Sequence, residues 1–171
     1  ATNLERSKYK DINFFMPPVD RGIECFDIYN LNPKNDLFYA ISHGVNRAKL
    51  KYGKLDNRLK FIKKLINKIK NIKYDFYGVN NKEPIWGDVF YRAITNSKMG
   101  LNLSRGTPTK HYSSNRIATF VGNGLLTFID EKVKMDTFFK KDELIFYSNL
   151  EDLVDKINFY SRNNKSRIQI S

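Results

Sequence analysis

The residues best suited to bind an anion lie between two apolar runs, 99–104 and 125–130. Ser113 and Ser114 are favourable N-cap residues for a helix that we expect to begin at Asn115. A helix N-terminus presents unpaired backbone N–H groups together with the positive end of the helix dipole, so it binds phosphate readily. The spacing therefore predicts an anion site in a strand–loop–helix unit.

Basic side chains lie on both sides of this predicted helix start. Arg105 opens the loop, and Arg116 falls in the first helical turn, where the helix dipole disfavours a cation. A charge in an unfavourable position is expected where it binds a ligand, so Arg116 is a candidate anion contact. The alternative is an ordinary strand–helix–strand crossover with solvated charges, and the spacing alone does not decide between them.

The composition indicates one folded domain. The chain has 171 residues, of which 41% are hydrophobic and 28% charged, which is typical of a globular protein rather than a disordered one. No apolar run reaches the roughly 20 residues that a membrane helix needs, and the polar start has no signal-peptide pattern. One cysteine and two histidines leave no cysteine-based zinc site, so we expect no metal and a cytoplasmic location.

The net charge of +12 favours an anionic partner. Between Arg47 and Lys73 the chain holds eleven basic residues and one acid, Asp56. Nucleotides, polyphosphates, nucleic acid and an anionic membrane surface all fit such a charge. Most of these lysines are explained by the solvated face of an amphipathic helix over 57–70, a face that could also rest peripherally on the inner membrane surface.

Hydrophobic periodicity predicts strands alternating with helices. We expect helix 87–96 to direct Val89, Phe90, Ala93 and Ile94 toward the core. The alternation predicts an α/β fold, a Rossmann-like doubly wound parallel sheet in a single domain. In such sheets ligands bind at the carboxyl ends of the strands. The predicted strands are 36–42, 73–79, 99–104, 125–130 and 144–148, the other helices are 57–70, 115–122 and 149–160, and loops 43–46, 79–82 and 105–114 share one rim.

This order of elements resembles the C-terminal, donor-binding half of a GT-B glycosyltransferase, most closely the CgeB-like, group 1-like branch. The resemblance covers about residues 14–162. It rests on the strand and loop 99–105, the SNRI helix start within 112–117, the glycine turn 122–124, and the first and last strand units, 36–47 and 142–160. It makes 1–35 a linker from an N-terminal half, 36–162 the nucleotide-sugar-binding domain, and 163–171 a basic tail.

The resemblance implies that this half binds a nucleotide-diphosphate sugar without a metal, while an N-terminal domain binds the acceptor. The base and ribose would lie near Gly78 and the helix start, and the diphosphate near the basic loop after the first strand. Thr119 stands where related sequences often carry a ribose-binding glutamate. The expected donor-binding residues are Asn46, Arg47, Lys51, Lys54, Gly78, Arg105, Ser113, Ser114, Asn115, Arg116 and Thr119.

The implied activity is sugar transfer to a glycan, lipid or protein, as in bacterial cell-envelope polysaccharide synthesis, with this half inactive alone and its catalytic residues unassigned. The alternative is a basic module that binds nucleic acid or a nucleotide without catalysis. The basic residues cluster on one helix and no RNA-binding motif is present, so nucleic acid is not expected. A receiver-like domain is disfavoured because the first strand ends in His43-Gly44 rather than in paired acids.

Overall fold

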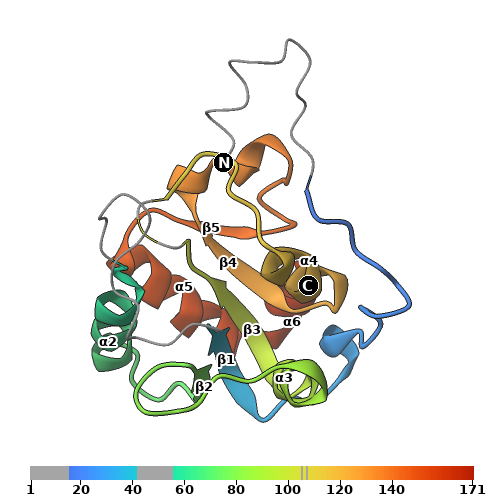
Figure 1. Ribbon diagram of the computed structural model, residues 1–171, viewed down its shortest axis with the longest axis horizontal. Coiled ribbons are helices and arrows are strands. Elements are labelled where there is room, and N and C mark those ends of the chain that lie inside the picture. The colour runs from blue at the N-terminus through green and yellow to red at the C-terminus, as the bar shows by residue number, and fades with distance from the viewer. Residues whose placement is uncertain (1–15, 42–55, 105, 107) are drawn as a thin grey trace.

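A parallel β-sheet lies at the centre of the computed structural model, which describes residues 16–41, 56–104, 106 and 108–171. Within these residues the sheet has five strands in the order β2-β1-β3-β4-β5, and every neighbouring pair is parallel. Figure 1 shows β1 and β3 in the middle of the sheet. The strands are β1 (Asn35–Ala40), β2 (Tyr74–Tyr77), β3 (Ser97–Asn102), β4 (Leu126–Asp130) and β5 (Ile145–Tyr147).

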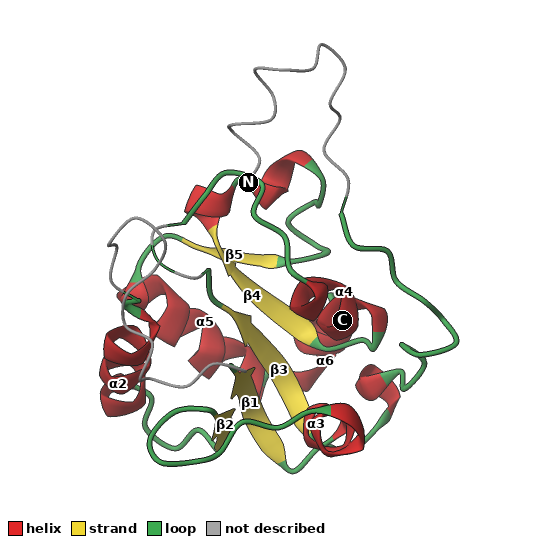
Figure 2. Cartoon of the chain, in the orientation of Figure 1, coloured by secondary structure: helices red, strands yellow, loops and turns green. Residues whose placement is uncertain are grey.

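Helices cover both faces of the sheet (Figures 1 and 2). On one face α2 (Arg58–Lys68) and α5 (Leu150–Arg162) pack against alternate residues of β1, including Leu37 and Tyr39. On the other face α3 (Gly87–Thr95) and α4 (Asn115–Gly122) pack against Phe38 and Ala40. The near-continuous apolar run of β1 is therefore explained, because both sides of this strand are buried.

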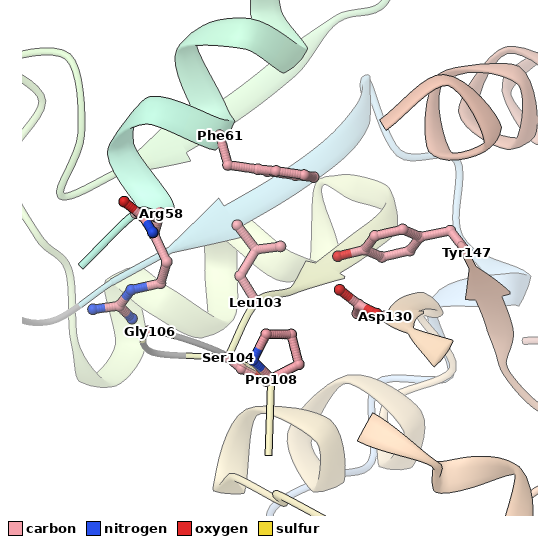
Figure 3. Close-up of a pocket in the computed structure, with 9 residues that line it drawn as sticks. Arg58, Phe61, Leu103, Ser104, Gly106, Pro108, Asp130 and Tyr147 are labelled. Atoms are coloured by element: carbon pink, nitrogen blue, oxygen red, sulfur yellow. The ribbon is translucent and has the colours of Figure 1, made fainter. Parts of the chain in front are cut away.

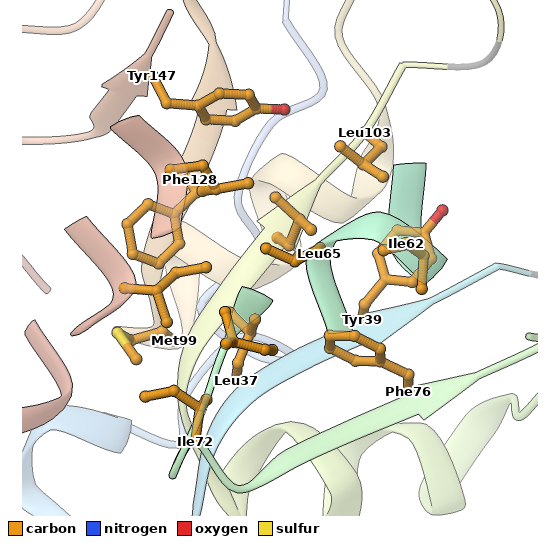
Figure 4. Close-up of a cluster of buried hydrophobic side chains, with 14 of the residues drawn as sticks. Leu37, Tyr39, Ile62, Leu65, Ile72, Phe76, Met99, Leu103, Phe128 and Tyr147 are labelled. Atoms are coloured by element: carbon orange, nitrogen blue, oxygen red, sulfur yellow. The ribbon is translucent and has the colours of Figure 1, made fainter. Parts of the chain in front are cut away.

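The two cores are built from side chains that the strands project in alternation. In the larger core, Ile62 and Leu65 of α2 meet Leu37, Met99 and Phe128 of the sheet (Figure 4). The smaller core depends on a glycine in β3. A Cβ atom at Gly100 would lie 2.6 Å from a ring carbon of Phe120, so only a hydrogen at this position lets α4 pack so closely.

The predicted sheet and helices are confirmed, with one error in the predicted core. Val89 is 53% exposed, whereas Ala93 and Ile94 of the same helix are buried. Val89 lies in the first turn of α3, beside the exposed residue Trp86, and this turn extends beyond the buried part of the helix. The helical period correctly predicted which face of α3 is buried, but it did not predict how far along the helix that burial extends.

Part of the predicted linker packs on the domain. Ile28 begins the 3-10 helix η1 (Ile28–Asn30) and is fully buried. Asn123, directly after α4, accepts hydrogen bonds from this segment: its backbone oxygen from the Ile28 N–H at 2.8 Å and its side-chain oxygen from the Phe26 N–H at 3.2 Å. The end of α4 therefore fixes the segment against the sheet domain.

The other end of the chain is also folded. Residues predicted as a basic tail form α6 (Asn164–Ile168), which follows α5 and buries the side chain of Arg167. The 3-10 helices η3 (Glu131–Val133) and η4 (Met135–Thr137) lie within the charged segment between β4 and β5. In the described ranges no helix is long and apolar enough to span a membrane.

Candidate functional site

The strand order creates a crevice between the carboxyl ends of β1 and β3. The chain leaves β1 toward α2 on one face of the sheet and leaves β3 toward α4 on the other. Open parallel sheets bind ligands at such a topological switch point. Tyr39 lies near the end of β1 and Asn102 ends β3, so these two side chains flank the crevice.

Two arginines at helix N-termini meet at this crevice. Arg58 begins α2, and its guanidinium forms an ion pair with Asp56, with 2.6 Å between Nη2 and Oδ2. Burial lowers the pKa of Arg58, but the hydrogen bonds that its guanidinium donates to Asp56, together with the charge of that carboxylate and the nearby tyrosines, outweigh that effect and raise it. The positive charge of Arg58 is thus largely neutralised within the protein.

Arg116 has no such neutralising partner. Its Nη1 lies 3.4 Å from Oδ1 of Asn102, and its guanidinium carbon lies 5.6 Å from the centre of the Tyr39 ring. Among the residues that the structure describes, no carboxylate pairs with it. Burial lowers the pKa of Arg116, and the nearby charge of Arg58 lowers it further. The site therefore carries a cation that favours an incoming anion.

Four buried polar atoms without partners among the described residues lie on the strand ends and loops of this edge of the sheet, and two of them, on Tyr39 and Asn102, belong to side chains beside Arg116. The Tyr39 hydroxyl, Nδ2 of Asn102, and the hydroxyls of Ser104 and Ser113 are buried and form no hydrogen bond within the described part of the chain. Buried polar groups are nearly always hydrogen-bonded, so the two unpartnered atoms beside Arg116, the Tyr39 hydroxyl and Nδ2 of Asn102, call for an explanation. A polar ligand in the crevice would supply the missing partners.

The serines begin α4 without capping it. Ser114 is the N-cap residue, as predicted, but its side chain makes no cap hydrogen bond, and its hydroxyl instead lies 3.4 Å from Oδ1 of Asn102. The Ile117 N–H donates to the Ser114 carbonyl at 2.9 Å, and within the described residues the N–H groups of Asn115 and Arg116 receive no cap from the Ser114 side chain. This is the arrangement in which a helix N-terminus binds an anion.

A cavity of about 310 Å³ opens beside Arg116. This volume lies at the lower end of the range for small-molecule sites, about 300–1,000 Å³. Three residues predicted from the sequence, Asn115, Arg116 and Thr119, line one wall. The remaining lining residues come from the end of β1 and the start of α3: Ala40, Ile41, Ile85, Trp86, Gly87, Phe90 and Tyr91.

A smaller cavity of about 120 Å³ lies among residues of α2 and the ends of β3, β4 and β5 (Figure 3). Arg58 and Ser104 line it, as do Asp130 and Tyr147, which lie close together in the figure. Burial raises the pKa of the Tyr147 hydroxyl, and the Asp130 carboxylate raises it further. This hydroxyl is thus a neutral hydrogen-bond donor at any ordinary pH.

The remaining predicted residues are not part of this cluster. Gly78 lies in the turn after β2 with φ +72°, and its N–H donates to the Lys82 carbonyl at 2.9 Å. A Cβ atom there would overlap the Ile41 carbonyl oxygen, so Gly78 has a packing role. The other predicted contacts, Asn46, Arg47, Lys51, Lys54 and Arg105, lie outside the described residues.

Sequence reasoning missed Tyr39, Arg58 and Asn102. Asn102 is a lone amide within an apolar strand, which is a usable signal. Arg58, like Arg116, is a cation at a helix start, but the lysines around it conceal that position. Tyr39 carries no signal, because a tyrosine in a buried strand is ordinary core. Among the described residues, no group of three His, Cys, Asp or Glu side chains could hold a metal.

The doubly wound parallel sheet and its switch-point crevice define a Rossmann-like domain of the GT-B type. Residues 57–171 match the model of the glycosyl transferase-like family, and the chain belongs to that family. The crystal structure of TarM has a similar fold, with a TM-score of 0.56 and 11% sequence identity over 92% of this chain. This chain spans 32% of the TarM chain. A comparison with curated protein sequences found no match.

Proposed function

We propose that this domain binds the diphosphate of a nucleotide-sugar donor and is the donor half of a glycosyltransferase. The observation that carries the proposal is Arg116, a half-buried guanidinium in the first turn of α4 without a carboxylate partner among the described residues. A buried charge is costly unless it is paired, and phosphate is the anion that the surrounding N–H and hydroxyl groups also suit.

The chemistry of sugar transfer requires a site of this kind. Negative charge develops on the diphosphate as the bond to the sugar breaks, and fixed positive groups stabilise that charge in the transition state. Arg116 and the N-terminus of α4 would provide this stabilisation without a metal. The unpartnered hydroxyl of Tyr39 and Nδ2 of Asn102 would donate hydrogen bonds to the same phosphates.

The nucleoside would occupy the larger cavity. Thr119 lines it one turn after Asn115, so its hydroxyl and the Asn115 amide are the groups placed to contact the ribose in the absence of a glutamate. An acceptor pocket would come from a second, N-terminal domain, consistent with the third of the TarM chain that this chain matches. The proposal also includes a glycan, lipid or protein as the acceptor. It further includes a peripheral contact of the domain with an anionic membrane.

The proposal is tested with the variant Arg116→Ala and the matched control Arg162→Ala, which removes an exposed arginine at the end of α5. Binding of UDP, GDP and CMP is measured by calorimetry, and thermal stability is measured with each nucleotide and with a short oligonucleotide. Hydrogen bonds to a charged group contribute about 1.5–3 kcal/mol, so Arg116→Ala should weaken UDP or GDP binding at least about tenfold.

The control variant should bind as the wild-type chain does. Equal nucleotide affinity in Arg116→Ala and the wild type would refute the site. Stabilisation by the oligonucleotide alone would favour a nucleic-acid-binding module instead. Arg116→Ala should not itself unfold the domain, because it removes an unpaired charge rather than one member of an ion pair.

A further inference from the structure

The larger cavity has two chemically different walls. One wall carries the polar side chains of α4, with Arg116 among them, and the other carries Ile85, Trp86, Phe90 and Tyr91. A nucleotide has the same division, because its base is a flat π-system and its phosphates are anions. The opposing walls therefore suit one orientation, with the phosphates toward Arg116 and the base toward the aromatic wall.

Trp86 is the aromatic side chain in that wall with a free face. It is 62% exposed, whereas Phe90 packs in the core against Phe38, with ring centres 5.5 Å apart. Tyr91 already contacts the rings of Phe26 and Phe90, at 5.7 and 5.9 Å. Within the described residues, no aromatic ring pairs with Trp86.

The backbone fixes Trp86 at the cavity. Trp86 is the extended N-cap residue of α3, and Gly87 follows it with φ +53° and no atom within 4 Å of where a Cβ would lie. The backbone after Trp86 is therefore not crowded by other elements. An exposed indole beside a cavity of nucleoside size is a ready stacking surface, since every nucleobase has a π-face.

We propose that Trp86 stacks on the nucleobase of the donor and so provides much of the affinity for the nucleoside half of the ligand. This inference rests on the proposed function, because it concerns the same cavity. It predicts that the domain distinguishes a nucleotide diphosphate from pyrophosphate through Trp86, and that Arg116 serves both ligands alike.

The chain has a single tryptophan, so its fluorescence reports on this position alone. UDP, GDP and inorganic pyrophosphate are titrated into the full chain, with affinities measured in parallel by calorimetry. UDP and GDP should quench or shift the emission on binding. Pyrophosphate should bind in an Arg116-dependent manner and leave the emission nearly unchanged.

Two variants separate stacking from other roles of Trp86. Trp86→Ala should weaken UDP or GDP binding about 5- to 150-fold, as expected for the loss of about 1–3 kcal/mol of base–aromatic stacking, and leave pyrophosphate affinity unchanged. Trp86→Phe should keep most of the affinity. Phe159→Ala, which removes a half-exposed ring from α5, is the matched control and should bind as the wild type does.

The outcomes distinguish the two proposals. If Arg116-dependent nucleotide binding leaves the tryptophan emission unchanged, or if Trp86→Ala binds UDP and GDP as the wild type does, the stacking inference is wrong and the proposed function stands. In that case a contact between Trp86 and a second domain becomes the better explanation. If none of the three ligands binds, the proposed function fails and the stacking inference fails with it.

Discussion

Replacing Tyr39 with phenylalanine separates the stability of the free domain from its affinity for an anion. The Tyr39 side chain is fully buried, and its hydroxyl finds no acceptor for its proton within the described residues, although the Arg58 guanidinium interacts with the hydroxyl oxygen. Phenylalanine keeps the ring, which contacts Phe76 with centres 5.9 Å apart and lies 5.6 Å from the Arg116 guanidinium carbon. Only the hydroxyl is lost.

The expected effects have opposite signs. An unsatisfied buried donor costs about 1–3 kcal/mol, so Tyr39→Phe should stabilise the free domain by about 1–2 kcal/mol. For a chain of this size that corresponds to a rise in Tm of about 2–8 °C. Binding of UDP or GDP should weaken about tenfold, because the hydroxyl no longer donates to the bound phosphate.

Urea unfolding and calorimetry measure the two effects on the same samples. A loss of stability in the free variant would mean that the hydroxyl has a partner in solution, and the argument from unpaired groups would then be wrong. Unchanged nucleotide affinity would place Tyr39 outside the ligand site. Either result can occur without the other, so each part of the reasoning is tested separately.

Alkaline unfolding gives a second measure of the same hydroxyl. Burial raises the pKa of Tyr39 to about 12, although Arg116 and Arg58 oppose the shift. The folded state thus favours the neutral hydroxyl. The resulting contribution to the free energy of unfolding is fully present below pH 10, about the pKa in the unfolded chain, and is lost as the pH rises through about 12. The wild type should therefore lose about 2–3 kcal/mol more than Tyr39→Phe over this interval.

Two further substitutions test the charge balance and the backbone of the site. Asn102→Asp places a carboxylate about 3.4 Å from Arg116, so the free energy of unfolding of the free domain, measured in urea, should rise by about 1 kcal/mol. The affinity for UDP or GDP, measured by calorimetry, should fall at least about tenfold. Tighter nucleotide binding would contradict an anion site. Gly78→Ala puts a Cβ atom on a residue with positive φ and against Ile41, so it should lower the free energy of unfolding by about 2–4 kcal/mol. Gly87→Ala, where φ is also positive but the space is open, should lower it by about 1 kcal/mol. Equal losses of stability in urea unfolding would contradict the packing role of Gly78.

Local sequence patterns were sufficient for the elements of this fold. The apolar run at β1 and the alternating helices predicted a doubly wound sheet, and Asn149 caps α5 by accepting a hydrogen bond from the Asp152 N–H at 3.0 Å. The same patterns were less successful in predicting which residues of each helix, strand or loop are buried. Val89 shares the apolar period of α3 but lies past the covered part of the helix, and Ile28 is buried by residues distant in sequence.

The candidate site shows the same limit. Asn115 and Arg116 were predicted from the helix start, and Thr119 from the resemblance to glycosyltransferases; the structure puts all three among the residues that line one cavity. Tyr39, Arg58 and Asn102 come from three other elements. Their convergence depends on strand order and on which face each crossover takes, and neither is encoded in a local pattern. Unpaired polar atoms reveal such residues only once the fold is known.

The hydrogen bonds of Asn123 also bear on how the chain folds during synthesis. Phe26 and Asn123 are 97 residues apart, so the residue that binds the segment around Phe26 is synthesised long after that segment. At about 5–20 residues per second the interval is about 5–20 s. During this interval Ile28 lacks the core residues that later bury it. The segment around Ile28 is therefore among the last parts of this domain to fold, although it is made before the strands and helices that bury it.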